Sequence, residues 1–335
     1  MEQIRRLVCH QGKGLVQGIG DDCAVVEKDG RHVWLLTMDT LIESVHFDCS
    51  WHPPFLLGRK AVSVNVSDIT AMGGRPVFAL LSLGLPADFA PEWVTELNRG
   101  IYDACGQYGC LLIGGDTVCS PGKIALTLTL IGEAARDQVL YRHGAAAGDI
   151  VWVSGVLGYA AAGLAYFRSG RTLAMQSEYP AEISRCIKTH LDPEARVDLA
   201  TALARTGVVH AMMDLSDGLA TDLSHLCRQS HVAAVIEEER LPGRQVLAPA
   251  ASLLGLSGKE ITGWMIAGGE DYELLFTASP EDRHIIQAAA SEHGVAVTPV
   301  GKILEGQGVH LRRKTACGYE DERISFQGFD HFIKS

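Results

Sequence analysis

Acidic residues that stand beside glycines or near helix ends recur along the chain, and their types define the chemistry open to it. Six such segments occur without any lysine or arginine, at residues 20–22, 37–40, 65–68, 114–116, 214–218 and 268–271. If these segments meet in the fold, their carboxylates repel one another unless cations neutralise them. Carboxylate and backbone oxygens suit hard cations such as Mg²⁺, which commonly bridges to substrate phosphates. The pattern therefore predicts an enzyme that handles phosphates with metal ions rather than with basic side chains.

Asp68 is the most informative of these residues. A helix is expected from residue 53 to about 72, and Asp68 falls in its core-facing stripe. The stripe has spacings of four, three, four and three residues and comprises Leu57, Ala61, Val64, Asp68 and Ala71. A buried carboxylate costs several kcal/mol unless it is paired or bound to metal, and the nearby helix C-terminus adds a further penalty. We therefore interpret Asp68 as a metal ligand, with a solvent-facing Asp at a frayed helix end as the alternative.

The other acidic residues each allow a functional and a structural interpretation. Asp39 is expected just after a strand at 32–38, where ligand groups collect in α/β folds, but an Asp-Thr pair also starts turns. Asp116 follows paired glycines, which permit close approach to a ligand or form a tight turn. Asp21 and Asp22 allow the same two interpretations.

The second half of the chain adds three further positions. Asp214 ends an expected strand, which favours a ligand role. Ser216 is a good N-cap for the helix expected next, with Asp217 in its first turn. Glu270 precedes a strand expected at 272–277 and is either a ligand contact or an exposed loop residue.

Composition narrows the class of protein. The chain has 335 residues, 47% hydrophobic and 21% charged, which suits two globular domains with substantial cores. A net charge of −11 argues against a nucleic-acid binder. No apolar run has the length of a membrane span, and the first 20 residues lack a secretory pattern. Nine scattered cysteines without a Cys-x-x-Cys pair indicate reduced thiols, so we expect a cytoplasmic protein.

Strands and helices are expected in both halves of the chain, which predicts an α/β or α+β fold. The first half has strands at 22–27, 32–38, 75–85, 111–113 and 123–133, and helices at 53–72 and 91–108. In the second half, strands near 150–154, 211–214, 232–237, 272–277 and 296–302 alternate with helices. Residues 134–149 are small and polar, and we expect domains at 1–137 and 138–335.

Taken in order, the six acidic segments resemble those of thiamine-monophosphate kinases. They read Gly-Ile-Gly-Asp-Asp-Cys-Ala from residue 18, Thr-Met-Asp-Thr-Leu-Ile-Glu-Ser-Val-His-Phe from 37, Asn-Val-Ser-Asp-Ile-Thr-Ala-Met-Gly from 65, Ile-Gly-Gly-Asp-Thr from 113, Asp-Leu-Ser-Asp-Gly-Leu from 214 and Gly-Gly-Glu-Asp-Tyr-Glu-Leu from 268. Each segment is weakly specific, but six in order extend the resemblance from about residue 15 to 332.

The resemblance implies an aminoimidazole-ribonucleotide-synthetase-like fold of two α/β domains. The N-terminal domain, 1–137, would bind ATP and Mg²⁺ and pair with a second copy into a β-barrel; the domain at 138–335 would complete the nucleotide and substrate site. The implied reaction converts ATP and thiamine monophosphate into ADP and thiamine diphosphate with several Mg²⁺ ions, by direct in-line transfer. The partners would be these two substrates and a second subunit, without nucleic acid or membrane.

Related enzymes on this scaffold match the sequence less well. The hydrogenase-maturation dehydratase has a cysteine at its extreme C-terminus, whereas the last cysteine here is Cys317. Cys9 through Lys13 only faintly resembles the loop of selenophosphate synthetases, and the Asp-Gly-Val-Gly-Thr-Lys motif of the purine-pathway synthetase is absent at Asp39. Another ATP-dependent enzyme of this scaffold and a non-catalytic nucleotide binder are the alternatives.

The resemblance also implies roles for individual residues, with Asp39 and Asp68 as the central catalytic pair. The implied metal-binding residues are Asp21, Thr37, Met38, Asp39, Asp68, Asp116, Asp214 and Asp217. The implied ATP contacts are Gly115, Asp116, Arg142 and Ser216. The implied thiamine monophosphate contacts are His46, Glu270 and Phe326. Met38 replaces a small hydroxyl residue and offers only its backbone oxygen; Phe326 replaces a Trp found in some members.

Overall fold

The computed structural model describes residues 12–324. The chain divides into two compact units, Met1–Tyr141 and Arg142–Ser335. Within residues 12–324, no helix combines the length and apolarity needed to cross a membrane.

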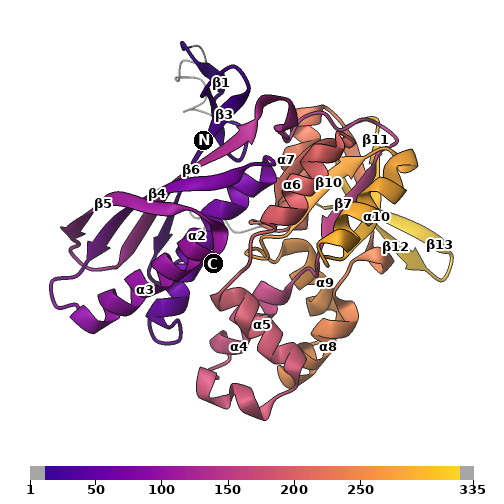
Figure 1. Ribbon diagram of the computed structural model, residues 1–335. Helices are drawn as coiled ribbons and strands as arrows, with labels where there is room; N and C mark the ends of the chain where they lie inside the picture. The colour runs from indigo at the N-terminus through magenta and orange to yellow at the C-terminus, as the bar shows by residue number, and fades with distance from the viewer. Residues whose placement is uncertain (1–11, 325–335) are drawn as a thin grey trace. The chain divides into compact units, whose positions relative to one another are not determined.

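The N-terminal unit contains a six-stranded sheet in the order β1-β2-β3-β6-β4-β5 (Figure 1). Its strands are β1 (Leu15–Gln17), β2 (Ala24–Glu27), β3 (His32–Ile42), β4 (Arg75–Leu85), β5 (Leu111–Cys119) and β6 (Ala125–Ala135). All neighbouring strands are antiparallel except β4 and β5. The strand expected at 32–38 is longer than predicted, because β3 pairs with β6 along its whole length. Asp39 therefore lies within β3, whereas the sequence had suggested a position just after the strand.

Two helices, α2 (Pro54–Ala71) and α3 (Pro91–Tyr108), lie side by side on one face of this sheet (Figure 1). Each begins with proline in its first turn, where the missing N–H costs nothing. The backbones approach closely at Gly100, where a Cβ would collide with the carbonyl of Phe55. Because α2 packs against both α3 and the sheet, it is buried nearly all round, including Lys60. A short 3₁₀ turn, η1 (Arg136–Gln138), ends the sheet region.

Strand β5 differs most from its prediction. The run Leu-Leu-Ile at 111–113 reads as a short buried strand, but β5 extends from Leu111 to Cys119 and all nine residues are exposed. It forms the edge of the sheet and pairs only with β4 among the described strands. The prediction was wrong because the burial of a strand depends on its neighbours, and this edge has none on its outer side.

The C-terminal unit contains a seven-stranded sheet in the order β13-β12-β9-β11-β7-β10-β8. Its strands are β7 (Ile150–Ser154), β8 (Val209–Asp214), β9 (Ala233–Glu237), β10 (Leu274–Ala278), β11 (Val297–Leu304), β12 (Gly308–Thr315) and β13 (Gly318–Ile324). Every residue of β7 and β10 is buried, so both faces of the sheet centre are covered. Trp152 of β7 stacks on Phe276 of β10 at 6.2 Å between ring centroids.

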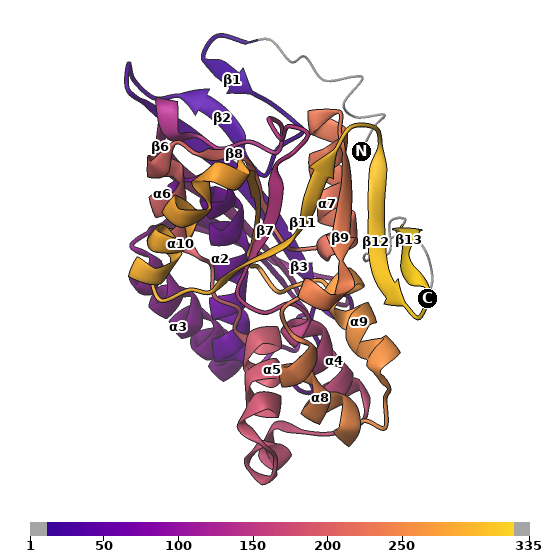
Figure 2. The ribbon, with the colours of Figure 1, turned by 90° about the vertical axis from the view of Figure 1, so that its right-hand side faces the viewer.

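The helices of this unit either pack on the second sheet or pack mainly on one another. They are α4 (Tyr159–Arg168), α5 (Ala181–Leu191), α6 (Val197–Thr206), α7 (Leu219–Ser230), α8 (Arg244–Leu253), α9 (Gly258–Ala267) and α10 (Arg283–Glu292), with 3₁₀ turns η2 (Leu173–Glu178), η3 (Glu238–Arg240) and η4 (Pro280–Asp282). Helix α7 packs against β8, β9, β10 and β12, while α4, α5 and α8 pack on one another (Figure 2).

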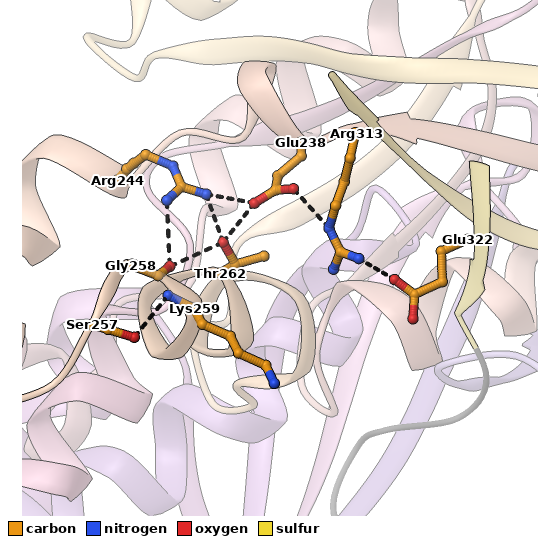
Figure 3. Close-up of polar contacts among 8 residues, drawn as sticks. All are labelled: Glu238, Arg244, Ser257, Gly258, Lys259, Thr262, Arg313 and Glu322. Atoms are coloured by element: carbon orange, nitrogen blue, oxygen red, sulfur yellow. Dashed lines mark hydrogen bonds and ion pairs between the residues drawn. The ribbon is translucent and has the colours of Figure 1, made fainter. Parts of the chain in front are cut away.

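Strands β12 and β13 form a hairpin at the sheet edge that the sequence reading did not anticipate (Figure 2). A polar network fastens this hairpin to η3, α8 and α9 (Figure 3). Glu238 lies at its centre and pairs with Arg244 at 2.7 Å and with Arg313 at 2.9 Å. Arg313 also binds Glu322 of β13, and Thr262 of α9 donates to Glu238 at 2.7 Å. Single exposed pairs contribute little, so we attribute the orientation of the hairpin to the connected set.

Candidate active site

The strand β3 and the end of helix α2 carry the first group of predicted residues. The Thr37 hydroxyl donates a 2.5 Å hydrogen bond to the Asp68 carboxylate. Two residues further along β3, the Asp39 N–H donates to the Asn65 side chain at 3.1 Å, and Asn65 in turn donates to the Ala61 carbonyl. Odd-numbered residues of β3 face α2 because side chains alternate along a strand. Thr37, Asp39, Asn65 and Asp68 therefore meet between β3 and α2.

Asp22 joins this group from the loop between β1 and β2. It is 8% exposed, and one of its carboxylate oxygens lies within 4.8 Å of one from Asp68. The loop is fixed at Cys23, whose N–H donates to the sulfur of Met72 just beyond α2. Two carboxylates this close, with a hydroxyl beside them, form an all-oxygen donor set of the kind that suits a hard divalent cation. The predicted ligand Asp21 lies next to Tyr141: burial, and then the charge of Asp21, raises the pKa of Tyr141.

His46 follows the end of β3 and has a defined ring orientation. The Ile42 N–H donates to His46 Nδ1 at 3.0 Å, so in the neutral ring the proton resides on Nε2. Nε2 is therefore a donor suited to an anionic oxygen. From Asp39 to Ile42, whose N–H binds the His46 ring, the strand advances roughly 10 Å.

The structure does not bring Asp116 to this group within the N-terminal unit. Asp116 is paired with Ser82 of β4, on the face of the sheet opposite to Asp39, and both β6 and β4 lie between β3 and β5. Three strand spacings separate the two carboxylates by roughly 14 Å. Gly115 precedes Asp116 on β5, and the Met38 side chain, 64% exposed, shares the outer face of the sheet with Asp116. These three residues are exposed together, away from Asp68.

In the C-terminal unit, the predicted residues lie at the end of β8 and in the loop before α7. Asp214 is 1% exposed and ends β8 opposite Leu274 of β10. The expectation that Ser216 caps the next helix was wrong: α7 begins at Leu219 after Gly218, whose φ of 100° no capping serine would adopt. Asp217 consequently precedes the helix, and the loop from Asp214 to Gly218 turns sharply between strand and helix.

This loop is joined to the segment that carries Glu270 by backbone hydrogen bonds. The Glu270 N–H donates to the Ser216 carbonyl at 2.8 Å, and the Tyr272 N–H donates to the Leu215 carbonyl at 2.9 Å. Gly269 makes this approach possible, because a Cβ there would collide with the Ser216 carbonyl oxygen. Glu270 and Tyr272 both have positive φ, 69° and 50°, so the segment is not the regular strand expected from residue 272.

Buried charges anchor the Glu270 segment to the unit. The Asp271 carboxylate accepts the N–H groups of Gly158 and Ala160 at 2.5 and 3.0 Å and so caps α4. Burial raises the pKa of Asp271 to about 7, although these two bonds oppose the rise. Glu273 accepts two bonds from Arg196, at 2.8 and 2.5 Å, and one from a serine of β7 at 2.5 Å. The positions on both sides of Tyr272 are thereby fixed.

Two residues near these loops were not predicted from the sequence. His190, at the end of α5, is 2% exposed and its Nδ1 lies 3.3 Å from the Glu270 carboxylate. Asp222, in the first turn of α7, is 1% exposed and accepts the Asp217 N–H at 3.1 Å. Burial, then the charges of Asp217 and Asp214, raises the pKa of Asp222 well above its ordinary value, while Arg142 opposes the rise. Arg142 thus belongs to the same group, whereas the predicted Phe326 lies outside the described residues.

A signal for Asp222 was present in the sequence. It follows Asp217 by five residues within an amphipathic helix in which Leu219, Leu223 and Leu226 are apolar. A charged residue on that apolar face is the same kind of anomaly that singled out Asp68. No comparable signal marks His190, because its partner lies 80 positions away and a lone histidine on a helix is usually structural.

Comparison with known proteins places this arrangement in a class. Residues 20–134 match the family model of the AIR synthase related protein N-terminal domain, and residues 146–314 match that of the C-terminal domain. HypE of Escherichia coli, a hydrogenase maturation protein, shares the fold with a TM-score of 0.68 at 19% identity, covering 88% of this chain and 85% of HypE. The expected two-domain mixed α/β fold of the aminoimidazole-ribonucleotide-synthetase type is confirmed.

Closer similarity narrows the class to one family. The thiamine-monophosphate kinase of Haemophilus influenzae is 34% identical over 95% of this chain and 92% of its own length. The one from Aquifex aeolicus is 37% identical over 94% and 92%. The structure of AaThiL complexed with AMPPCP and TMP has a TM-score of 0.83 at 35% identity, covering 99% of this chain and 95% of that one. The chain belongs to the thiamine-monophosphate kinase family.

Proposed function

We propose that the chain transfers the γ-phosphoryl group of ATP to thiamine monophosphate, forming thiamine diphosphate and ADP. One observation carries the proposal: each of the two units holds a group of acidic side chains, with oxygen donors only, at the predicted residues. The chain also matches these kinases over nearly its whole length. The first group contains Asp39 and Asp68, and the second contains Asp214 and Asp217. The complex of AaThiL with AMPPCP and TMP supports the same pair of substrates.

We assign divalent cations, in the cell Mg²⁺, to these groups. The residues proposed to hold them in the first unit are Asp21, Thr37, the backbone of Met38, Asp39 and Asp68; Asp22 fits the same role because of its proximity to Asp68. Asp214 and Asp217 serve the second unit. When bound, the cations neutralise phosphate charge, which matters because two unit charges 4 Å apart repel by about 4 kcal/mol at an effective dielectric of 20.

The remaining residues bind and orient the two substrates. Ser216 and Arg142 are proposed to contact ATP, and Glu270 to contact thiamine monophosphate. His46 is proposed to donate from Nε2 to the acceptor phosphate, in keeping with the hydrogen bond that fixes its ring. The nucleophile is already an anionic phosphate oxygen, so positioning and charge stabilisation account for catalysis without a strong general base.

We further propose that the protein is a homodimer that pairs through the outer face of the N-terminal sheet, as the family resemblance suggests. Large apolar side chains are exposed on β3, β4 and β5, among them Met38, Leu80 and Ile113 at 64%, 38% and 56%. Gly115 and Asp116 share this region with them. A second copy seated there would cover the β5 edge and provide a route for Asp116 to reach nucleotide in the assembled enzyme.

The dimer is tested by light scattering coupled to size-exclusion chromatography. Ile113→Asp should convert a dimer of wild type into a monomer. The matched control is Tyr102→Asp on α3, an 80% exposed position away from the sheet, which should remain dimeric. A monomeric wild type, or an unaltered dimer of Ile113→Asp, would refute this interface.

The reaction is tested with purified protein, ATP, Mg²⁺ and thiamine monophosphate, with thiamine diphosphate quantified by chromatography. Asp39→Asn and Asp68→Asn should abolish product while leaving the circular dichroism spectrum unchanged. Absence of product from folded wild type would reject the kinase assignment; binding without turnover would indicate a nucleotide binder, and turnover of another phosphorylated acceptor a different enzyme of this scaffold. A phosphoenzyme formed from labelled ATP would contradict direct transfer.

A further inference from the structure

Asp222 is a buried carboxylate to which neither the predicted site nor the proposed function gives a role. It is the fourth residue of α7, is 1% exposed, and its Oδ2 accepts the backbone N–H of Asp217 at 3.1 Å. Asp214 and Asp217 flank it on the loop between β8 and α7, and Arg142 is the opposing charge. Burying a carboxylate beside two others is costly, so the position calls for a compensating function.

Stabilisation of its own helix does not supply that function. An acidic residue in a first turn interacts favourably with the helix dipole, by a few tenths of a kcal/mol to about 1 kcal/mol, which is less than the cost of burial. The N-cap of α7 is Gly218, which has no side chain with which to cap the helix. The Asp222 carboxylate instead reaches back across the loop to the N–H of Asp217. This bond ties the end of the loop, at Asp217, to the first turn of α7.

The bond between Asp217 and Asp222 has a geometric consequence. Asp217 precedes α7, so its backbone is held neither by helix nor by strand, whereas Ser216 and Leu215 are tied to the Glu270 segment. The bond to Asp222 fixes the peptide of Asp217 and so the direction in which its side chain leaves the loop.

We propose that Asp222 is a positioning residue, which holds Asp217 by its backbone N–H so that Asp217 and Asp214 converge on one divalent cation. The inference rests on the proposed function only in assigning a cation to these two carboxylates. Asp222 does not contact the cation in this account; it acts through Asp217.

Two neutral substitutions with the same branching as aspartate isolate the hydrogen bond. Asp222→Asn and Asp222→Leu both remove the titratable carboxyl, but only the asparagine oxygen can accept the Asp217 N–H. Binding of Mn²⁺, a Mg²⁺ substitute visible by electron paramagnetic resonance, is measured on the full chain with AMPPCP present. We expect Asp222→Leu to weaken Mn²⁺ binding tenfold or more and Asp222→Asn to weaken it less than threefold. Mg²⁺ activation midpoints in the kinase assay should shift in the same order, with kcat at saturating Mg²⁺ largely retained.

Asp198→Ala is the control, because it removes an exposed carboxylate from the first turn of α6 in the same unit. It should bind Mn²⁺ like wild type. Equal Mn²⁺ affinity in Asp222→Leu and Asp222→Asn would overturn the proposal: if both match wild type, the bond is only structural, and if both are weak, the charge itself acts at the cation. Because Mn²⁺ binding needs no turnover, an inactive wild type would reject the proposed reaction without deciding this point.

Discussion

Replacing Asp271 with asparagine should change how the stability of the chain depends on pH. In the fold, burial raises the pKa of Asp271 from its ordinary 3.8 to about 7, and the charges of Glu273 and Glu270 add to the rise. In the unfolded chain the same carboxyl ionises near its ordinary pKa. Between these two values the unfolded state releases a proton that the folded state retains, so folding becomes less favourable as pH rises.

The magnitude follows from the size of the pKa shift. Stability changes by about 1.4 kcal/mol per pH unit for each proton that differs between the states. Over the whole window this amounts to about 4 kcal/mol, of which about 3 kcal/mol falls between pH 5 and pH 8. Asparagine cannot ionise, so Asp271→Asn lacks this slope. It does lose one of the two bonds to the α4 N-terminus, at a constant cost of about 1–3 kcal/mol.

Urea unfolding of wild type and variant, followed by circular dichroism from pH 5 to pH 8, measures the difference in unfolding free energy. Subtracting the unfolding free energy of the variant from that of wild type removes the contribution of all carboxyls that both proteins share. The unfolding free energy of wild type relative to that of the variant should fall by about 3 kcal/mol from pH 5 to pH 8. Above pH 8 the difference should become constant.

Glu260→Gln provides the matched control. The Ser257 hydroxyl and nearby backbone N–H groups lower the pKa of this exposed carboxyl, so it is ionised in both states throughout the assay. Its difference curve should be flat from pH 5 to pH 8. A flat curve for Asp271→Asn as well would refute the reasoning, because Asp271 would then ionise at the same pH whether the chain is folded or not.

Three other perturbations test the packing and the metal dependence. Arg196→Ala leaves the Glu273 carboxylate buried without its ion-pair partner and should lower the unfolding free energy in urea by about 3–5 kcal/mol. Adding Glu273→Gln should restore part of the loss. A double variant no more stable than Arg196→Ala alone would argue against the ion pair. Gly100→Ala should destabilise the N-terminal unit by about 1–3 kcal/mol or more, because its Cβ meets the Phe55 carbonyl. Gly106→Ala in the same helix has open space beside it and should be neutral or stabilising. Equal melting temperatures of the two variants would contradict the close helix contact. EDTA should abolish product formation and remove the rise in melting temperature caused by AMPPCP with Mg²⁺, and metal-independent activity would exclude the cation role given to the acidic groups.

Elements whose signals are local could be predicted well from the sequence. Proline starts and glycine stops delimit α2 and α3, and the expected helices at 53–72 and 91–108 match the observed Pro54–Ala71 and Pro91–Tyr108 closely. The apolar run of β7 was placed without error at Ile150–Ser154. Asp68 was proposed as a ligand because a carboxylate on an apolar helix face is unusual, and that anomaly is visible without a structure.

Features that depend on distant partners could not be predicted in the same way. The exposure of β5 follows from its place at the sheet edge, which its own residues do not encode. The turn at Ser216 was mistaken for a helix cap because the chain turns at Gly218, with its positive φ, before α7 begins at Leu219. The contact of His190 with Glu270 joins two segments through the packing of α5, and no spacing in the sequence reveals it.

The backbone bonds between the Ser216 loop and the Glu270 segment have an evolutionary consequence. The two segments are about 50 residues apart, yet Gly269 must remain without a side chain for the Ser216 carbonyl to approach. A larger residue at 269 is tolerated only if the loop at 216 moves, so the two positions are expected to covary among relatives. The intervening chain, which forms α7, β9, α8 and α9, returns to the same place at Gly268. Insertions in its outer turns, such as the one around Gly255, should therefore accumulate without displacing either segment.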